Sequence, residues 1–332
     1  MNVEFHYYIT YLIAARAGFD PKEASIIAYA SQYVDDNYRA FEISKGTPNA
    51  YNNYISQTMN ILKPKKELFL IYLLFHFIPG DPMSEGAKRR DGTSHMLNTT
   101  PNSKNANDLF DSALTSKNSY RIGIATHSFA DTWSHQNFVG CYDEFNSFKG
   151  IVERLTPNIG HADAYYVPDL PAVLWSDKRL VGKYMKIYNK QRVLDAARRM
   201  CEKLLIYISP TMEKQDIDRA CDLLSKDLAY AIGKLDQKNR YKEARIKRYK
   251  ELANRKEYGN TELKDYTKDE WFYDAVKLNT EETKSDLYNW KDQKHYKKSD
   301  WYMFQEAVKE HQEEAMNILK ERNFKDIQLE KW

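Results

Sequence analysis

Two histidines and an aspartate follow a regular four-residue spacing in one stretch of the chain, and these residue types can hold a metal ion. His127, Asp131 and His135 stand at i, i+4 and i+8, which aligns side chains along one face of a helix. Imidazole and carboxylate groups are ligands for zinc and neighbouring divalent ions. His127 and His135 would lie about 12 Å apart on an ideal helix, too far to share one ion comfortably. Because a carboxylate can bridge two ions, the spacing predicts a multinuclear site around Asp131. A stripe of hydrogen-bonded core residues is the alternative.

Further candidate ligands come from other segments. They are His6 near the start of the chain, Asp35 or Asp36, His76 at the end of an apolar run, and His161. For each one alone, a buried hydrogen-bonded role or a surface role is the commoner interpretation. Burying several imidazoles without a metal, however, would leave polar groups unsatisfied or shift their pKa values.

The elements that must position these residues are predicted to be helices. Residues 4–17 read as a helix that ends at Gly18, since glycine favours the left-handed position after a helix. Asp20 and Pro21 begin a second helix that carries Asp35 and Asp36 at its C-terminal end. Residues 49–62 are compatible with a helix, and residues 157–177, with their prolines and glycines, should be irregular. Further predicted helices are 65–77, 105–116, 119–136 and the chain from about 178 onward. No run alternates with period two, so the predicted fold class is all-α.

Composition narrows the function classes. The net charge of +3 gives no whole-molecule attraction to nucleic acid or acidic membranes. Three cysteines without a CxxC pair indicate neither a disulfide framework nor a thiolate zinc site. The N-terminus lacks the features of a signal peptide. The most apolar run, residues 67–78, is shorter than the roughly 20 residues of a membrane span. We therefore expect a cytoplasmic protein with no transmembrane segment.

The last third of the chain differs in composition from the rest. From about residue 236 it is rich in Lys, Glu and Tyr and holds four of the six tryptophans. We predict a metal-binding helical core at residues 1–235 and a charged, aromatic-rich helical accessory region at residues 236–332. Amphipathic helices packed on the core are the plain interpretation. A surface for a homo-oligomer or a protein partner is the alternative, because exposed Trp and Tyr are typical interface anchors.

Several motifs resemble known proteins. The order His, Asp, His, then HxxxD on a helix, then two more histidines resembles the zinc-dependent phospholipase C and S1/P1 nuclease superfamily, all-helical hydrolases with a three-zinc cluster. More closely, the chain looks like the bacterial family DUF6765, whose function is unknown, over roughly residues 1–205. The motifs that carry this likeness are FHYY at 5–8, IAYASQYVDD at 27–36, FHFIPG at 75–80, HSFADTWSHQ at 127–136, Gly160-His161 and Pro168-Asp169.

The resemblance to the superfamily implies a phospholipase C/P1 nuclease-like helical core and a ligand set. One ion would be held by Asp35 or Asp36, His76, His127 and Asp131, a second by His6 with Asp131, and a third by His135 and His161, completed by Asp163 or Asp169. Two or three Zn²⁺ ions are expected, with Mn²⁺ or iron as alternatives. The chain departs from the superfamily pattern in three places. It begins with Met1 instead of a tryptophan whose amine is a ligand, its third helical histidine stands at i+8, and Tyr165 replaces an acidic residue.

These observations together predict a metal-dependent hydrolase of phosphate esters, phosphodiesterase-, phospholipase C- or nuclease-like, that uses metal-activated water. Asp131 is the predicted central catalytic carboxylate, and Asp36, if not a ligand, would orient the water. Lys88, Arg89 and Arg90 are predicted to bind the phosphate of a phospholipid, nucleotide or nucleic acid, although such a run is more often a solvated loop. Another metallohydrolase, an oxygenase-like site and a non-catalytic metal-stabilised scaffold or partner-binding protein remain open. The chain contains no His-Asp dipeptide, GxSxG or GxxxxGK[ST] motif.

Overall fold

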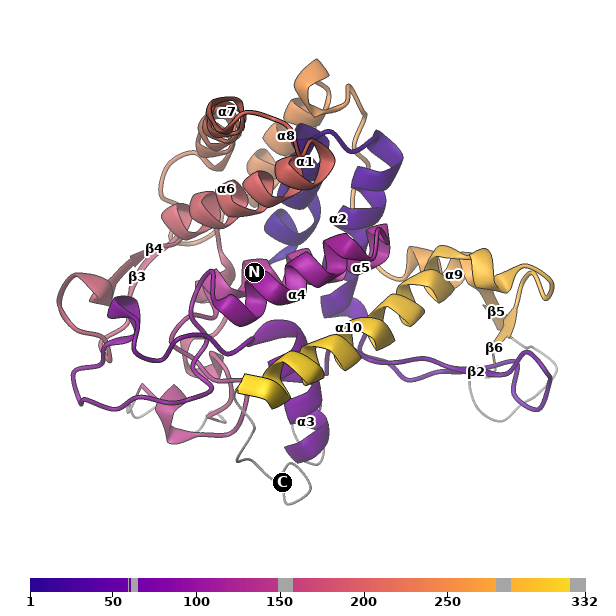
Figure 1. The fold of residues 1–332 in the computed structure, drawn as a ribbon, viewed down its shortest axis with the longest axis horizontal. Coiled ribbons are helices and arrows are strands. Elements are labelled where there is room, and N and C mark those ends of the chain that lie inside the picture. Colours follow the sequence, from indigo (N-terminus) through magenta and orange to yellow (C-terminus); the bar gives the residue numbers. More distant parts are fainter. Residues whose placement is uncertain (59, 61–64, 149–157, 279–287, 323–332) are drawn as a thin grey trace.

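The first two helices bring candidate ligands into the core from the start of the chain. The computed structural model describes residues 1–58, 60, 65–148, 158–278 and 288–322, and most of them are helical (Figure 1). A π-helical segment, η1 (Glu4–Ile9), continues into α1 (Thr10–Ala17), and Gly18 ends it with a φ of 105°. Helix α2 (Pro21–Asp36) begins at Asp20, whose side chain accepts hydrogen bonds from the next backbone N–H groups. Both helices confirm the sequence prediction.

Two ligand-bearing segments are π-helical turns. His6 lies in η1, and His76 closes η2 (Tyr72–His76), which continues α3 (Lys65–Ile71). A π turn adds a residue to each hydrogen-bonded ring, is rare, and is found frequently at functional sites. The predicted helices at 4–17 and 65–77 are therefore present, but the side chains within them do not follow α-helical spacing throughout.

Helix α5 (Ser119–Ser134), which carries His127 and Asp131, packs closely on α2, while α4 (Lys104–Thr115) covers another side of α5. Gly123 makes this approach possible. A Cβ atom at Gly123 would lie 2.5 Å from the Ile27 carbonyl oxygen and 2.6 Å from the Ala30 Cβ, so α2 and α5 could not lie so near each other with any larger residue there.

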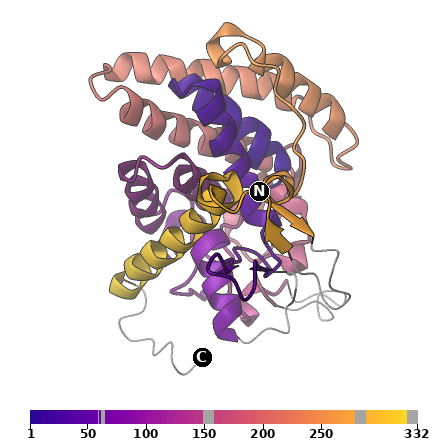
Figure 2. The same cartoon turned by 90° about the vertical axis from the view of Figure 1, so that its right-hand side faces the viewer.

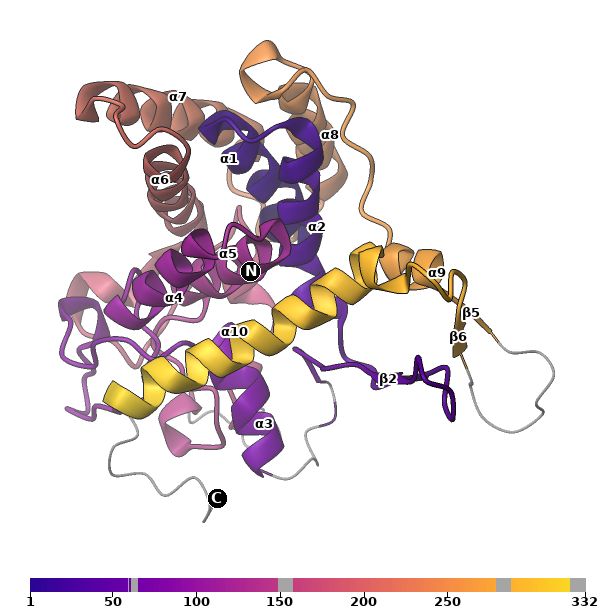
Figure 3. The ribbon, with the colours of Figure 1, turned by 45° about the vertical axis from the view of Figure 1, so that its right-hand side comes forward.

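The C-terminal helices cover the rest of the core. They are α6 (Asn189–Ile208), α7 (Lys214–Ile232), α8 (Lys242–Ala253), α9 (Glu270–Ala275) and α10 (Asp300–Arg322). Helices α6–α8 lie with α1 at the end of the molecule opposite α3 (Figures 1 and 2). Helix α10 runs across the molecule and packs against α4, α5 and η2 (Figure 3). One buried apolar cluster extends from Met1 to Leu319. The division of the chain at residue 235 stays a prediction.

Short strands interrupt this helical arrangement. One sheet has the order β2-β1-β6-β5, and β3 pairs with β4 in a second sheet. Their bounds are β1 (Glu42–Ile43), β2 (Tyr51–Asn52), β3 (Leu174–Ser176), β4 (Lys186–Tyr188), β5 (Val276–Leu278) and β6 (Tyr288–Trp290). The 3₁₀ turns are η3 (Glu85–Ala87), η4 (Glu144–Asn146), η6 (Ala162–Ala164), η7 (Val167–Asp169), η8 (Gly182–Met185), η9 (Lys256–Tyr258) and η10 (Tyr296–Lys298).

The expectation of continuous helix from 178 is wrong where β4, β5 and β6 lie, because strands of two or three residues are too short to show alternation. The helix considered over 49–62 is replaced by β2 and irregular backbone in its described part; residues 59 and 61–64 lie outside the described residues. Over the described part of the chain, no helix has both the length and the apolar character that crossing a membrane requires.

Candidate metal centre

Three groups of histidine and aspartate side chains meet in the interior. In each group, one ligand atom from every member lies within 4.8 Å of the others. The groups, which we name central, Asp35 and Asp169, are His6–His127–Asp131, Asp35–His76–His127 and His135–His161–Asp169. Several His/Asp sets in this chain could therefore bind metal, and they combine residues from segments far apart in sequence.

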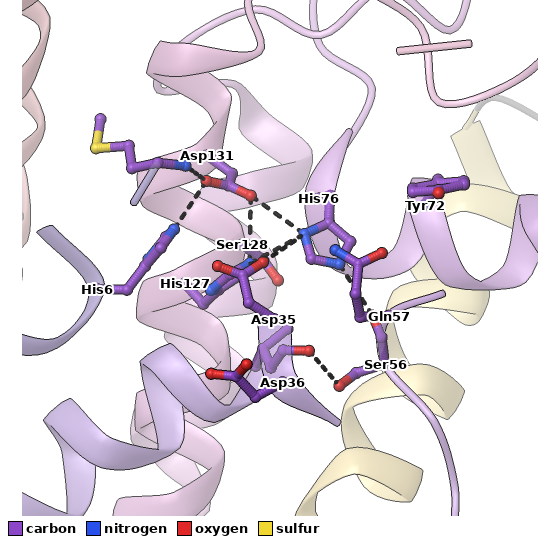
Figure 4. A network of polar contacts seen from close by, with 12 residues as sticks. His6, Asp35, Asp36, Ser56, Gln57, Tyr72, His76, His127, Ser128 and Asp131 are labelled. Atoms are coloured by element: carbon purple, nitrogen blue, oxygen red, sulfur yellow. Dashed lines mark hydrogen bonds and ion pairs between the residues drawn. The ribbon is translucent and has the colours of Figure 1, made fainter. Parts of the chain in front are cut away.

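Asp131 joins the groups because its two oxygens face different partners (Figure 4). Its Oδ1 lies 3.1 Å from His6 Nε2, while its Oδ2 lies 3.3 Å from His76 Nδ1 and 3.2 Å from His127 Nε2. Burial alone would raise the pKa of Asp131, but electrostatic interaction with His135, the amino group of Met1 and His127 holds it well below its usual value. Asp131 is therefore an anion placed as a bridging carboxylate would be.

The Asp35 group has the dimensions of a tetrahedral site. His76 Nδ1 and His127 Nε2 lie 3.1 Å apart, and each lies 3.8 Å from Asp35 Oδ1. The same two nitrogens lie 3.3 and 3.2 Å from Asp131 Oδ2. In a tetrahedral zinc site with bonds of about 2.0–2.1 Å, two ligand atoms are roughly 3.3 Å apart, so the observed separations lie around this value. The three donor atoms of the Asp35 group are thus close enough together to bind one ion.

Backbone carbonyls fix the orientation of four imidazoles. A carbonyl oxygen only accepts hydrogen bonds, so the ring nitrogen beside it must carry the proton, and the other nitrogen offers its lone pair to the centre. Histidines that bind metals have this arrangement. The bonds run from His127 Nδ1 to Ser31 O (2.8 Å), from His76 Nε2 to Ser56 O (2.9 Å), from His135 Nδ1 to His76 O (2.8 Å) and from His161 Nδ1 to Tyr165 O (2.6 Å).

The Asp169 group lies where α5 ends. His135 is the residue that caps α5, and its Nε2 lies 3.4 Å from Asp169 Oδ1. His161 Nε2 lies 3.4 Å from Asp169 Oδ2. The preceding Gly160 has a φ of +53°, and a Cβ atom there would lie 2.5 Å from the ring of Phe77, so glycine is needed to bring His161 into place.

The amino group of Met1 lies between the central and Asp169 groups. It contacts the Asp131 carboxylate, lies 3.0 Å from Ser134 Oγ, and lies 3.4 Å from Asp169 Oδ1. Burial alone would lower the pKa of this amine, yet the charges of Asp131 and Asp169 raise it to about 10. The surroundings therefore favour a positive charge at this point.

Among the described residues, some of the candidate ligands are partly exposed to solvent and others are buried. The Asp35 side chain is 27% exposed, His161 is 19% exposed and Asp169 is 17% exposed, whereas His6, His127 and Asp131 are buried. An ion in the Asp35 or Asp169 group would therefore have an accessible side, as catalytic sites require.

Some predicted residues lie outside the three groups. Asp36 accepts hydrogen bonds from Gln32 and Tyr266 and pairs with Lys268 at 3.3 Å. Asp163 Oδ2 accepts from the backbone of Phe148. Neither Asp36 nor Asp163 belongs to any of the three groups. The groups therefore do not support the predicted catalytic role of Asp36 or the predicted ligand roles of Asp36 and Asp163. Of the predicted phosphate-binding residues, Lys88 pairs with Glu85, Arg89 is buried and Arg90 is exposed.

The carbonyl groups of Ser31, Ser56 and Tyr165 cannot be predicted from residue types, because every residue has a carbonyl and only the fold places one beside an imidazole. Tyr165 stands where an acidic ligand was expected, and it contributes its backbone, in a left-handed conformation with φ of 52°, instead of its side chain. The place of the Met1 amine beside Asp131 and Asp169 is likewise not predicted by the sequence, in which Met1 is only a departure from the tryptophan of the phospholipase C and nuclease superfamily.

Comparison with known proteins gives one match. No curated protein and no solved structure matches this chain significantly, so the likeness to the phospholipase C and S1/P1 nuclease superfamily rests on motif order alone. The model of the DUF6765 family, described as a family of unknown function, matches residues 1–319. The match continues far beyond residue 205, where the local motifs end, and includes most of α10. The chain belongs to the DUF6765 family.

Proposed function

We propose that this protein is a metal-dependent hydrolase of phosphate esters with a multinuclear His/Asp centre. The observation that carries the proposal is the convergence of imidazole lone pairs and carboxylates around Asp131, with solvent access at Asp35 on one side and at His161 and Asp169 on the other. Zn²⁺ is the favoured ion because of the nitrogen and oxygen donors and the near-tetrahedral spacing of the Asp35 group. Mn²⁺ and iron accept the same donors.

Metal explains the donor set better than protons do. His76 Nδ1 and His127 Nε2 lie 3.1 Å apart, and both face Asp131 Oδ2. Lone pairs at this distance repel each other unless a positive charge lies among them. A proton is shared by a single donor and acceptor, whereas a divalent ion held by His76, His127 and Asp131 would place positive charge beside all three side chains.

The residues have distinct parts in the proposed reaction. Divalent ions held here would polarise a phosphoryl oxygen and lower the pKa of water toward about 7. Asp131, whose pKa is held low by its surroundings, would balance the positive charge of ions held in the central and Asp35 groups. Asp35 and Asp169 are partly exposed, so substrate would approach the centre beside these two residues. A row of cationic positions suits the charge that develops in phosphoryl transfer, and the motif order shared with the phospholipase C and nuclease superfamily supports the same reaction.

A metal-stabilised scaffold is the second candidate, and the burial of His6, His127 and Asp131 favours it. These ligands come from η1 and α5, and His76 and Asp35 add η2 and α2. Ions in such positions would fasten helices together without turnover. For both candidate functions we propose a cytoplasmic location and a division of the chain at residue 235. Residues 236–332 would then bind a second copy of the chain or a protein partner.

Metal analysis of protein purified without chelators tests the centre. We expect two or more ions per chain in the wild type, and a strong loss in Asp131→Asn. His295→Ala is the control, because His295 is exposed and pairs only with Asp292 among the described residues. Fewer than about 0.5 ions per chain in the wild type, or equal retention in both variants, would contradict the metal site.

Activity separates the hydrolase from the scaffold. The metal-loaded protein is assayed with bis-p-nitrophenyl phosphate, phosphatidylcholine, single-stranded DNA and RNA. We expect turnover of at least one substrate that disappears in Asp131→Asn and persists in His295→Ala. Bound metal that raises the melting temperature, combined with no turnover when Zn²⁺, Mn²⁺ or Fe²⁺ is supplied, would support the scaffold.

A further inference from the structure

A cavity of about 340 Å³ lies outside the three His/Asp groups and has a strongly basic lining. We name it the arginine cavity. Its charged residues are Arg89, Arg90, Asp91, Lys178 and Arg179, and Phe148 also lines it. The sequence predicts phosphate binding for the first basic run, Lys88 to Arg90, whereas Lys178 and Arg179 lie far from it along the chain and no motif connects them to it.

Backbone pairing brings the two basic segments together. Arg89 forms an isolated antiparallel bridge with Leu180. The N–H of Arg90 donates to the Arg179 carbonyl at 2.8 Å, and the N–H of Val181 donates to the Lys88 carbonyl at 3.1 Å. The residues of both segments therefore reach one cavity because of fixed hydrogen bonds and not because of chance contacts between loops.

Two buried guanidinium groups form one wall of the cavity. Arg89 is 7% exposed and Arg179 is 8% exposed, and both donate to the carbonyl oxygen of Phe145, at 2.7 and 3.0 Å. Asp177 holds Arg179 through two short bonds of 2.9 and 2.7 Å. The bonds from Arg89 to Asp91 are long, 3.4 Å each. Arg89 is thus the less neutralised of two like charges that meet at one oxygen.

Charge is not balanced around the arginine cavity. Four cationic side chains line it, Arg89, Arg90, Lys178 and Arg179, and the carboxylates that contact them are Asp91 and Asp177. Arg90 and Lys178 are exposed, and neither forms an ion pair with any residue that the structure describes. Among the described residues, the cavity therefore has two positive charges in excess.

We propose that the arginine cavity binds the phosphate group of a phosphorylated small molecule. A phosphate monoester carries a charge of about −1.5 to −2 at pH 7 and three acceptor oxygens, which matches the excess of two positive charges. Arginine forks and a lysine ammonium are the groups that bind such an oxyanion. The volume leaves room for an organic group beside Phe148. This binding does not depend on hydrolysis at the metal centre.

The arginine cavity lies one aromatic ring away from the Asp169 group. The Arg179 guanidinium lies over the Phe138 ring, 4.2 Å from the ring centre, and the ring centres of Phe138 and His161 are 6.0 Å apart. Phe138 thus contacts a residue of the arginine cavity and a residue of the Asp169 group. The residues that line the cavity are not members of the three His/Asp groups, so binding at the two places can be measured separately.

Calorimetric titration of the metal-loaded protein with inorganic phosphate and with phenyl phosphate tests this proposal. The test variant is Arg90→Ser/Lys178→Ser, and the matched control is Lys183→Ser/Lys186→Ser, which removes two exposed charges from the neighbouring segment outside the cavity. We expect the wild type and the control to bind one more equivalent of phosphate ligand than the test variant, or to bind it with an affinity at least about tenfold higher. This affinity should fall as salt is added.

Equal stoichiometry and affinity in all three proteins would overturn the proposal, as would an equal loss in the control. Tighter binding of phenyl phosphate than of inorganic phosphate would identify an organic phosphate as the ligand, and equal binding would identify free phosphate. Thermal melting checks the fold. If the double variant does not fold, Arg90→Ser and Lys178→Ser are tested singly, and each should weaken binding.

Discussion

Asp35 and Asp36 are neighbours at the end of α2, but their carboxylates have different partners. Asp35 Oδ1 lies 3.8 Å from both His76 Nδ1 and His127 Nε2. Asp36 bonds instead to Tyr266 and Lys268. Burial raises the pKa of Asp35 although the two histidines oppose the rise, as expected of a carboxylate that an ion would stabilise in its charged form.

Asparagine at each of these positions separates the two roles. We expect Asp35→Asn to lower metal affinity by at least about tenfold to a hundredfold, because it removes a charged donor from the Asp35 group. Asp36→Asn should keep its metal and lose only the bond to Lys268. Metal content after dialysis against a weak chelator measures both. Loss of metal in Asp36→Asn with retention in Asp35→Asn would reverse the assignment.

Residue types and spacing predicted which side chains were candidates but did not choose between neighbours. One step along a helix turns a side chain by about 100°, and the sequence does not locate the last turn of α2 to one residue. Asp35 and Asp36 were therefore left as alternatives. Asp163 and Asp169 lie in short 3₁₀ turns, η6 and η7, where no periodicity indicates which one faces His161.

At the scale of elements, the contact between α2 and α5 positions the Asp35 group. It brings Ser31 O to His127 Nδ1 across the interface. Gly123→Ala would place a Cβ atom 2.5 Å from the Ile27 carbonyl oxygen, so α2 must shift away from α5. We expect a loss of about 1–3 kcal/mol in unfolding free energy from this overpacking, together with weaker metal binding.

Gly86→Ala is the control for Gly123→Ala. A Cβ atom at Gly86 would have no neighbouring atom within 4 Å, and its φ is not in the left-handed region. Urea unfolding and metal content are measured for both variants. A Gly123→Ala protein as stable and as metal-rich as Gly86→Ala would show that the close approach of the helices is not needed.

The helices over 4–17 and 65–77 followed from their apolar patterns and end signals, but their π turns did not. A helix that is apolar on all faces is buried whether its turns are α or π. Its sequence therefore does not show where a π turn includes one more residue in each hydrogen-bonded ring than an α turn does. The strands were missed for another reason. Ile43 and Tyr288 belong to β1 and β6, which pair although far apart in sequence, and strands this short are selected by tertiary contacts.

At the scale of the whole molecule, a buried charge network ties the start of the chain to α8. Arg245 donates to both oxygens of Glu4, at 2.8 and 2.9 Å, and to Asp236 at 2.8 Å. Burial alone would raise the pKa of Asp236, but N–H groups of Tyr241 and Arg240 and the Arg245 side chain hold it below 3.8. The network joins the η1 segment that carries His6 to the region after residue 235.

This network predicts a pH dependence of stability. Because the folded-state pKa of Asp236 is below its unfolded value of 3.8, its contribution is present above pH 3.8 and is lost as the pH falls through the lowered pKa. We expect Asp236→Asn to lose on the order of 1–3 kcal/mol near neutral pH, with a smaller difference from wild type in strong acid. Urea unfolding across pH measures it, with the exposed Asp274→Asn as control. A difference that grows toward acid would contradict the assignment.

The burial of His6, His127 and Asp131 has a kinetic consequence. Because these three side chains are buried, we expect an ion in the central group to leave only after an ion beside it has left, and to arrive only before that neighbour does. Metal removal by excess chelator should therefore proceed in at least two phases, and the slower phase should be the release of the central ion. Asp35→Asn should shorten this slower phase. Stopped-flow release measured with a chromogenic chelator would show a single phase if the positions exchange independently. On this basis, we expect the fold to set the order in which ions enter, and in the proposed hydrolase the last ions to bind would be the ones that meet the substrate.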